Sequence, residues 1–214
     1  MGKVITDYFS GAFCINLDER PERMKQAQAE FDRLGLDVIR MQAMKGNPHG
    51  AVSKLLPNEI GCKQSHMNCI ITAARKEWKS VLIFEDDVVL ADNANELFTR
   101  YMEDVPDDWA MIYLGGNHWG WNLGERDKPQ LERVADNVYR TKNTLTTHAY
   151  AIRWMVWGHA LEEMMKHDVA VDVVYGHIQR EYPCYALRPN LAWQRDGWSD
   201  INNKKCNYYF IREW

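Results

Sequence analysis

The stretch VLIFEDD, residues 81–87, decides the fold class, because four apolar residues run directly into Glu85, Asp86 and Asp87. A short apolar run bounded by polar residues is typical of a strand covered on both faces, as in a mostly parallel α/β sheet. Three carboxylates can follow such a strand only where it emerges at the sheet edge, since burying them unpaired costs too much free energy. Loops at that edge of an open α/β sheet usually form the ligand crevice. The stretch therefore predicts a core strand that ends in a binding site.

The three adjacent acids predict a divalent metal site. Neighbouring carboxylates repel one another, and a hard cation such as Mg²⁺ or Mn²⁺ removes that repulsion while binding one or two carboxylates together with phosphate oxygens of a substrate. The alternative is a solvated acidic turn. Residues 88–90 (VVL) disfavour that alternative, because the acids are enclosed by core-like sequence. The pattern indicates transfer chemistry on a phosphate-bearing donor.

Strand and helix signals alternate along the chain, which predicts one three-layer α/β domain over residues 1–214. Gly35 is expected to end the first long helix, Asn58 to cap the second, and Gly115 with Gly116 to permit close backbone approach after a strand. Residues 117–130 have the composition of a mobile active-site loop or of a packed flap, and residues 189–214 are expected to wrap over the sheet. Strands are expected at residues 11–16, 37–41, 81–84, 110–114, 138–140, 146–152 and 184–187, and helices at 22–34, 58–78, 93–102, 155–166 and 173–181.

Composition excludes several classes of protein. The net charge of −4 argues against a protein whose main task is holding nucleic acid, which needs a concentrated basic face. Five cysteines, an odd number without a C-x-x-C pair, imply neither a zinc site nor a disulfide framework. No apolar stretch approaches the ~18 residues of a membrane span and no signal-peptide core is visible, so a cytoplasmic protein is expected. Nine Trp and ten Tyr weakly favour a glycan ligand.

Several segments, taken in their order, resemble glycosyltransferase family 25. This family includes bacterial lipopolysaccharide sugar transferases and collagen galactosyltransferases, and compact relatives decorate viral surface glycoproteins. The resemblance implies a GT-A fold, a nucleotide-sugar donor that is usually UDP-linked, a Mn²⁺ or Mg²⁺ ion, and a glycan or glycoprotein acceptor bound by the C-terminal part. The segments are residues 15–18 (INLD) with Arg20 and Arg23, 58–62 (NEIGC) with Ser65 and His66, the EDD end of 81–87, 114–115, 147–152, 171–172, Gln194 and 199–201.

The resemblance also implies roles for the three acids. Asp87 is expected to coordinate the metal directly, and Glu85 to reach the metal, a metal-bound water or the ribose. Asp86 would coordinate the metal or lie near the sugar at the reacting centre. A further ligand is expected from late in the chain, with Gln194, Asp196 and His177 as candidates.

Donor-binding residues are expected on two other segments. Asn16, Leu17 and Asp18 are placed to hold the uridine, while Arg20 and Arg23 could make charge-assisted contacts to phosphate. A surface ion pair is the alternative for the two arginines. Ser65 and His66 are expected to orient the donor, with a packed, hydrogen-bonded histidine as the alternative.

Family membership would imply inversion at the anomeric carbon, which needs a carboxylate to take the proton from the acceptor hydroxyl. We assign that role to Asp172, with Asp196 and Asp200 as rivals. The alternative for Asp172 is a helix N-cap, because it follows apolar residues 169–171 and begins a helix.

Two other functions fit part of the pattern. A metal-dependent nucleotidyltransferase would share the sheet and acids, but it usually needs a glycine-rich basic loop, and residues 46–50 lack the placement and lysine of a P-loop. A glycan-binding module without transferase activity could use the same acids with a metal ion and exposed Trp, although the long helix expected at residues 58–78 disfavours a β-rich lectin.

Overall fold

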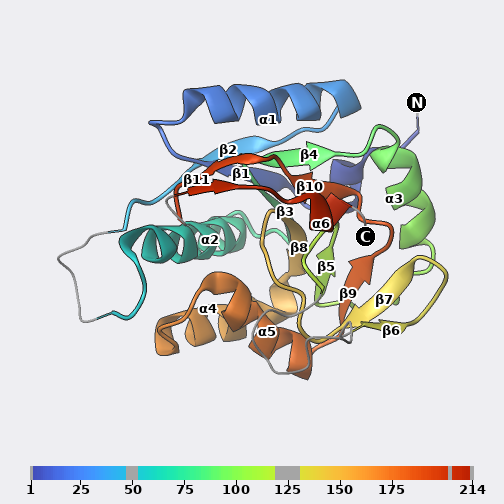
Figure 1. The fold of residues 1–214 in the computed structure, drawn as a ribbon. Helices are drawn as coiled ribbons and strands as arrows, with labels where there is room; N and C mark the ends of the chain where they lie inside the picture. The colour runs from blue at the N-terminus through green and yellow to red at the C-terminus, as the bar shows by residue number, and fades with distance from the viewer. Residues whose placement is uncertain (1, 47–52, 119–130, 202–203, 213–214) are drawn as a thin grey trace.

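The computed structural model describes residues 2–46, 53–118, 131–201 and 204–212. These residues form an eight-stranded sheet flanked by helices (Figure 1), with the strand order β2-β1-β3-β8-β5-β9-β7-β6. Six strands run in one direction, while β7 and β8 run against them, so the predicted α/β fold class is confirmed. The sheet is mixed, because three of its neighbouring pairs are parallel and four are antiparallel. The strands are β1 (Ala12–Asn16), β2 (Ile39–Gln42), β3 (Ser80–Glu85), β5 (Met111–Tyr113), β6 (Leu131–Arg133), β7 (Val138–Thr141), β8 (Ala149–Arg153) and β9 (Cys184–Leu187).

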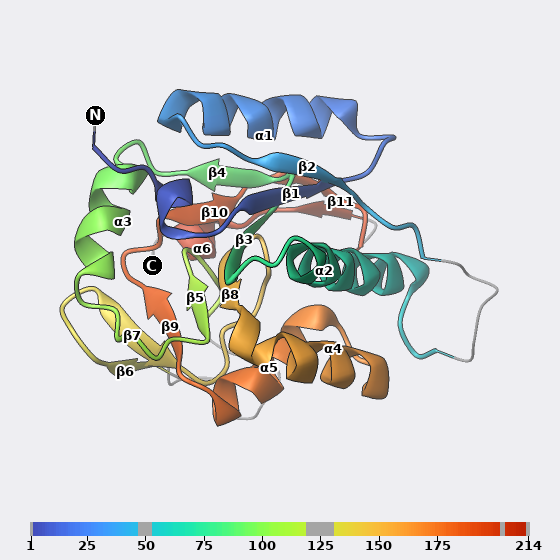
Figure 2. The same cartoon turned by 180° about the vertical axis from the view of Figure 1, so that it is seen from behind.

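The helices form an outer layer on each face of the sheet, with α1 on one side and α2, α4 and α5 on the other (Figure 2). None of the helices in the described part of the chain combines the length and the apolar character needed to cross a bilayer. The helices are α1 (Pro21–Leu34), α2 (Pro57–Arg75), α3 (Ala94–Met102), α4 (Trp157–Lys166), α5 (Val171–Glu181) and α6 (Tyr209–Arg212), with short 3₁₀ turns at Ile5–Tyr8 and Trp154–Val156.

Strand β3 shows why the sheet has two covered faces. Residues 81–84 of this strand are fully buried, and successive side chains of a strand point to opposite faces. Val81 and Ile83 pack in the cluster that contains the buried residues of α2, α4 and α5. Leu82 and Phe84 pack in the cluster that contains those of α1 and α3. The apolar run of the sequence therefore forms a strand of the central layer, with helices on both sides of it, as predicted.

The start of α2 corrects one prediction. The helix begins at Pro57 with Leu56 as its N-cap residue, and the Leu56 N–H donates to the Glu59 carboxylate at 2.7 Å. Asn58 is not the cap, because its side chain donates instead to the Asp200 carbonyl at 2.6 Å. The helix also ends at Arg75, three residues before the expected end at residue 78.

Two glycines have the roles that the sequence predicts. Gly35 ends α1 in the left-handed conformation, with φ of 67°, which costs a residue without a Cβ little. A Cβ at Gly115 would lie 1.8 Å from the Ala192 carbonyl oxygen, so only glycine allows the C-terminal segment to cross here.

That C-terminal segment is more regular than its sequence indicates. Strand β10 (Ala192–Gln194) pairs antiparallel with β4 (Val88–Leu90), and β11 (Gly197–Ser199) pairs with β12 (Lys204–Cys206). Neither pairing nor β6 was predicted, because strands of three residues are too short to show a period. The pairing of β10 with β4 places the tail directly beside the acids that follow β3.

His118 belongs to a buried hydrogen-bond network that ties this tail down, whereas residues 119–130 of the expected loop lie outside the described residues. The Asn190 amide donates to the Gly116 carbonyl at 3.3 Å and to the Ile211 carbonyl at 2.9 Å, so its Oδ1 is left to accept from His118 Nε2 at 3.2 Å. His118 Nδ1 then accepts from Thr144 Oγ1 at 2.8 Å. This arrangement requires a neutral imidazole.

We expect stability to fall as the pH drops from about 6.5 to 4, because burial lowers the pKa of His118 to about 4. In this pH range His118 binds a proton in the unfolded chain but not in the folded one. The free energy of unfolding is therefore lower by roughly 3 kcal/mol at pH 4. Urea unfolding across this pH range tests the effect in the wild type and in His118→Gln, which should lack that part of the pH dependence. An unchanged pH dependence in the variant would contradict the assignment.

Candidate functional site

The three acids lie at the carboxyl end of β3, as predicted, beside the end of β1. The two strands are parallel, with Ile15 opposite Glu85, so Asn16 is next to the acids. The Asn16 side-chain amide donates to Asp86 Oδ2 at 2.7 Å, and both residues are buried. The buried carboxylate of Asp86 thus lies against the first strand. Because burying an unpaired charge is costly, this carboxylate requires a compensating partner on its other side.

Arg23 of α1 supplies that partner. Its Nη2 lies 2.7 Å from Asp86 Oδ1 and 3.3 Å from Asp87 Oδ2, so one guanidinium bridges two adjacent acids. Gln194 reaches the same group from β10 and donates to Asp87 Oδ2 at 3.1 Å. The Arg195 N–H donates to the Asp87 carbonyl at 2.7 Å, which fixes the tail against the acidic loop. Asp86, Asp87, Arg23 and Gln194 form one cluster, which we call the acidic cluster.

Glu85 points to a different set of partners. It accepts from Thr147 Oγ1 at 2.6 Å, and His66 Nε2 lies 3.5 Å from the same oxygen. His66 Nδ1 is 2.9 Å from the Tyr150 hydroxyl, which contacts the Tyr175 hydroxyl at 2.7 Å. Burial alone would raise the pKa of Glu85, but these contacts from His66 and Thr147 lower it to about 2. Glu85 is therefore a fixed negative charge beneath the acidic cluster.

The acidic cluster has features that fit a hard cation. Asp87 Oδ1 and Gln194 Oε1 are buried oxygens without a hydrogen-bond partner within the described chain. Burial and the adjacent Glu85 charge raise the pKa of Asp87 to about 7, although Arg23 opposes this shift. The site thus carries more negative charge than Arg23 neutralises. Unpartnered oxygens beside excess negative charge are the donors that Mg²⁺ and Mn²⁺ prefer.

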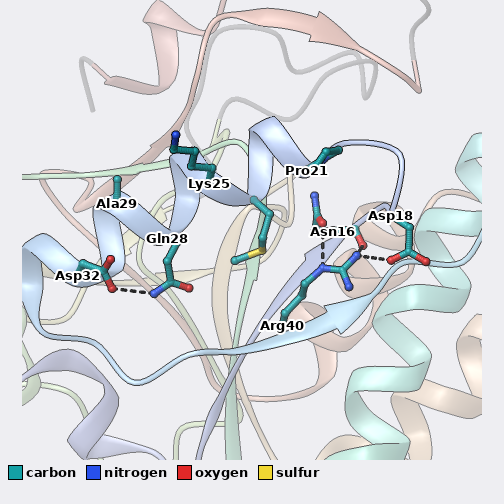
Figure 3. Close-up of a pocket in the computed structure, with 9 residues that line it drawn as sticks. Asn16, Asp18, Pro21, Lys25, Gln28, Ala29, Asp32 and Arg40 are labelled. Carbon is teal, nitrogen blue, oxygen red and sulfur yellow. Dashed lines mark hydrogen bonds and ion pairs between the residues drawn. The ribbon is translucent and has the colours of Figure 1, made fainter.

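A cavity of about 670 Å³ opens next to Asn16, between α1 and β2 (Figure 3). At its rim Arg40 of β2 binds Asp18 and donates from Nε to Asn16 Oδ1 at 3.0 Å. Gln42 also donates to Asp18, at 2.6 Å. The volume is in the range of small-molecule sites. Its lining residues are Asn16, Asp18, Pro21, Met24, Lys25, Gln28, Ala29, Asp32 and Arg40.

The turn after β1 joins this cavity to the acidic cluster. The Leu17 carbonyl accepts from the Arg20 N–H at 2.9 Å, and the Arg20 side chain binds the carboxylate of Asp200. Arg23 Nη1 lies 3.4 Å from the same carboxylate. Both predicted arginines are therefore near the acids and are also tied to the tail, so the ion-pair interpretation is correct for their present contacts.

A second cavity, of about 260 Å³, lies between α1 and the tail, directly over Asp87. Three arginines and three acidic residues contribute to its wall, so basic and acidic side chains line it in equal number. Its lining residues are Arg20, Glu22, Arg23, Gln26, Asp87, Arg195, Asp196, Gly197, Trp198 and Tyr208.

Ser65 is not brought to the acids. Its hydroxyl donates to the Gly61 carbonyl one turn earlier at 2.7 Å and accepts from the Met44 N–H at 2.8 Å. The residue is 1% exposed. In this structure Ser65 fastens the chain after β2 to α2, whereas His66 on the same helix contacts Glu85.

Asp172 lies in the first turn of α5 and is not its N-cap, because the helix begins at Val171 with Ala170 as the N-cap residue. Its carboxylate accepts from the Thr146 N–H at 3.2 Å and from the Val173 N–H at 2.9 Å. Thr146 has a φ of 70°, an uncommon conformation for threonine, and it directly precedes the Thr147 that binds Glu85. Burial raises the pKa of Asp172. Asp172 thus lies on the side of the site bounded by Thr147 and Glu85.

The other candidates from late in the chain have different neighbours. His177 Nδ1 lies 2.9 Å from Glu163 and does not contact the acidic cluster. Asp196 accepts from the Tyr208 N–H at 2.7 Å, and Asp200 is held by two arginines. Of the three predicted candidates for a further ligand, Gln194 is the one whose side chain contacts Asp87.

Arg40, Gln42 and Arg195 are site residues that the sequence reasoning missed. The sequence could have indicated Arg40 and Gln42, because parallel strands bring their carboxyl ends to one edge of the sheet and residues 40–42 end the second strand. Arg195 gave no local signal, because its position depends on the pairing of β10 with β4.

Comparison with known proteins supports the family resemblance. Residues 9–160 match the model of "Glycosyltransferase family 25 (LPS biosynthesis protein)". A Drosophila melanogaster protein, "Glycosyltransferase 25 family member", is 29% identical over 161 residues, which cover 65% of this chain and 26% of that protein. The human "Inactive glycosyltransferase 25 family member 3" is 27% identical over 130 residues, covering 50% and 22%.

The chain spans about a quarter of the length of these curated relatives. Among solved structures, A197 from STIV is similar over 91% of this chain and 92% of that chain, with a TM-score of 0.48 and 10% identity. The sheet with helices on both faces agrees with the GT-A fold that the resemblance implies. Because the family match covers residues 9–160 and includes the acids after β3, the chain belongs to glycosyltransferase family 25.

Proposed function

We propose that this protein is a metal-dependent glycosyltransferase. It would transfer a hexose or deoxyhexose from a UDP-sugar to a hydroxyl of a glycan on a glycoprotein or lipopolysaccharide. The observation that carries the proposal is the acidic cluster, where buried oxygens of Asp87 and Gln194 have no hydrogen-bond partner among the described residues. Asp87 lines the smaller cavity, and Asn16, which binds Asp86, lines the larger one. Family membership supports the reaction class.

The larger cavity is the proposed place of the nucleoside. Asn16 and Asp18 line it, with Leu17 between them in the chain, and Arg40 and Gln42 hold the Asp18 carboxylate in position. Met24 and Ala29 add an apolar surface for the flat face of a base. In this arrangement the ribose and diphosphate would extend from Asn16 toward Asp86 and Asp87.

Asp87 and Gln194 would hold a Mn²⁺ or Mg²⁺ ion, with Asp86 or Glu85 as further ligands directly or through water. When bound, such an ion neutralises negative charge on the diphosphate as the leaving group departs. Arg23 occupies part of this place now, so donor binding would draw it from the acids toward a phosphate oxygen. Arg20 and Arg195 lie around the smaller cavity and would add further charge there.

Asp172 is the proposed base. Its carboxylate would accept the proton of the acceptor hydroxyl as that hydroxyl attacks the anomeric carbon, which gives inversion. Backbone N–H groups of Thr146 and Val173 hold the carboxylate in place. Of its two rivals, Asp200 is bound by two guanidinium groups, whereas Asp196 accepts a hydrogen bond from the Tyr208 N–H.

Calorimetric titration with UDP, with and without Mn²⁺, tests the donor site. We expect UDP to bind far more tightly when Mn²⁺ is present, and UDP-sugars to be hydrolysed slowly without an acceptor. A glycan-binding module without transferase activity is the second candidate, because Trp198 is exposed beside the smaller cavity. Binding of free glycans with Ca²⁺, together with no binding of UDP, would replace the transferase proposal with that one.

A further inference from the structure

A second group of potential metal ligands lies where the end of α4 meets α5, outside the acidic cluster. Glu163 Oε2 is 2.9 Å from His177 Nδ1 and 3.2 Å from His167 Nε2. One ligand atom from each of these three residues lies within 4.8 Å of the others. The two imidazole rings are perpendicular, with centroids 4.9 Å apart. Two nitrogens and one oxygen therefore converge on one point.

The positions of these side chains follow from helix geometry. His159, Glu163 and His167 are spaced four residues apart, so they share one face of α4 and its end. Helix α5 lies beside α4 (Figures 1 and 2), and its His177 contacts Glu163 on that face. The Lys63 ammonium donates to the His167 carbonyl at 2.8 Å, which fixes the chain between the two helices.

The electrostatics of the group also suit a cation. Only 11% of the Glu163 side chain is exposed, so its negative charge is largely shielded from solvent. His159 Nε2 lies 4.0 Å from Glu163 Oε1, near enough to become a fourth ligand after a small rotation. Lys166 Nζ, 3.6 Å from the same oxygen, is a competing charge, but its side chain is 63% exposed and can move into solvent.

The donor atoms match the ligand set of a transition metal. Zn²⁺ binds imidazole nitrogen and carboxylate oxygen at about 2.0–2.2 Å, so tetrahedral ligand atoms lie about 3.3 Å apart. The observed separations of 2.9 and 3.2 Å need little adjustment to reach that value. Mg²⁺ and Mn²⁺ favour oxygen-rich sites, whereas imidazole favours Zn²⁺ and its neighbours in the transition series.

We propose that Glu163, His167 and His177 form a binding site for Zn²⁺ or a similar transition-metal cation. A bound ion would join α4 to α5, the helix whose first turn carries Asp172. Binding of the cation at this site needs neither the sugar donor nor the glycan acceptor, so the site is independent of the proposed transferase reaction.

The test is a calorimetric titration of chelator-treated protein with Zn²⁺, repeated in single-site variants. We expect one equivalent to bind the wild type, and His177→Gln and His167→Gln each to weaken binding by more than about 100-fold, since losing even an outer partner of a ligand costs about 10- to 100-fold. Glu162→Gln is the matched control for Glu163→Gln, because Glu162 is exposed on the same helix. Thermal unfolding without metal shows whether each variant folds.

Cys62, His66 and Glu85 form another group that could bind Zn²⁺, so Cys62→Ser separates the two sites. We expect Cys62→Ser to bind Zn²⁺ like the wild type, and Co²⁺-loaded wild type to show tetrahedral absorption without thiolate charge-transfer bands. Loss of binding in Cys62→Ser, unchanged affinity in both histidine variants, or the absence of saturable Zn²⁺ binding would each overturn the proposal.

Discussion

Asp87→Asn is expected to reduce Mn²⁺-dependent UDP binding and sugar transfer by more than about 100-fold. Asparagine keeps the shape of the side chain and can still meet Gln194, but it removes the charge that a cation needs. Removing one preorganised electrostatic contact at a reacting centre costs about 10²- to 10³-fold. Calorimetry with UDP and Mn²⁺, and turnover of a UDP-sugar, measure the two losses.

The same variant should fold at least as well as the wild type. Burial and the charge on Glu85 raise the pKa of Asp87 to about 7, so the folded protein is under charge repulsion that asparagine relieves. A thermal midpoint equal to or above that of the wild type, measured without metal, would separate lost binding from lost structure. Asp92→Asn is the control, because Asp92 is fully exposed and pairs with Arg33. Metal-dependent UDP binding within about threefold of the wild type in Asp87→Asn would contradict its role as a ligand.

Asp172→Asn is expected to lower kcat by about 10²- to 10⁴-fold, the usual contribution of a positioned general base. The amide oxygen of asparagine can still accept from Thr146 or Val173, but it cannot take a proton at neutral pH. Donor binding should not change, because Asp172 does not contact the acidic cluster. Steady-state turnover together with UDP calorimetry separates these two effects.

Asp168→Asn provides a matched control for Asp172. Asp168 also accepts a backbone N–H, from Lys54, but it lies before α5, and its hydrogen-bond partners in the described chain are Ser53 and Lys54, which are outside the proposed transferase site. If Asp172→Asn retained full turnover while Asp196→Asn or Asp200→Asn lost it, the base would be one of those rivals. A loss of UDP affinity in Asp172→Asn equal to the loss of kcat would instead indicate a positioning role.

The local pattern of the sequence determined the central layer of the fold and the place of the acids. Residues 81–84 fit a strand buried on both faces, because successive side chains of a strand alternate between its two faces and all four are apolar. The acids then had to emerge at the sheet edge, where Asn16 arrives on the neighbouring parallel strand. Gly35 marked a helix end because its left-handed conformation is a property of one residue.

Other features depended on contacts between distant residues. Gln194 meets Asp87 only because β10 pairs with β4, although 107 positions separate the two residues. Asn58 could have capped α2, but its side chain binds the tail, and the helix instead begins one residue earlier. A periodic pattern reports which side of an element is buried, yet it carries no information about its partner.

The sequence by itself therefore determined the fold class, the buried strand and the acidic end of that strand, since these follow from the local spacing of apolar and charged residues. Only the tertiary structure decided which charges meet. It placed Arg23 across two acids, turned Glu85 toward His66 and Thr147, and brought His177 to Glu163. Those pairings are set by how helices pack on the two faces of the sheet and by where the tail crosses it.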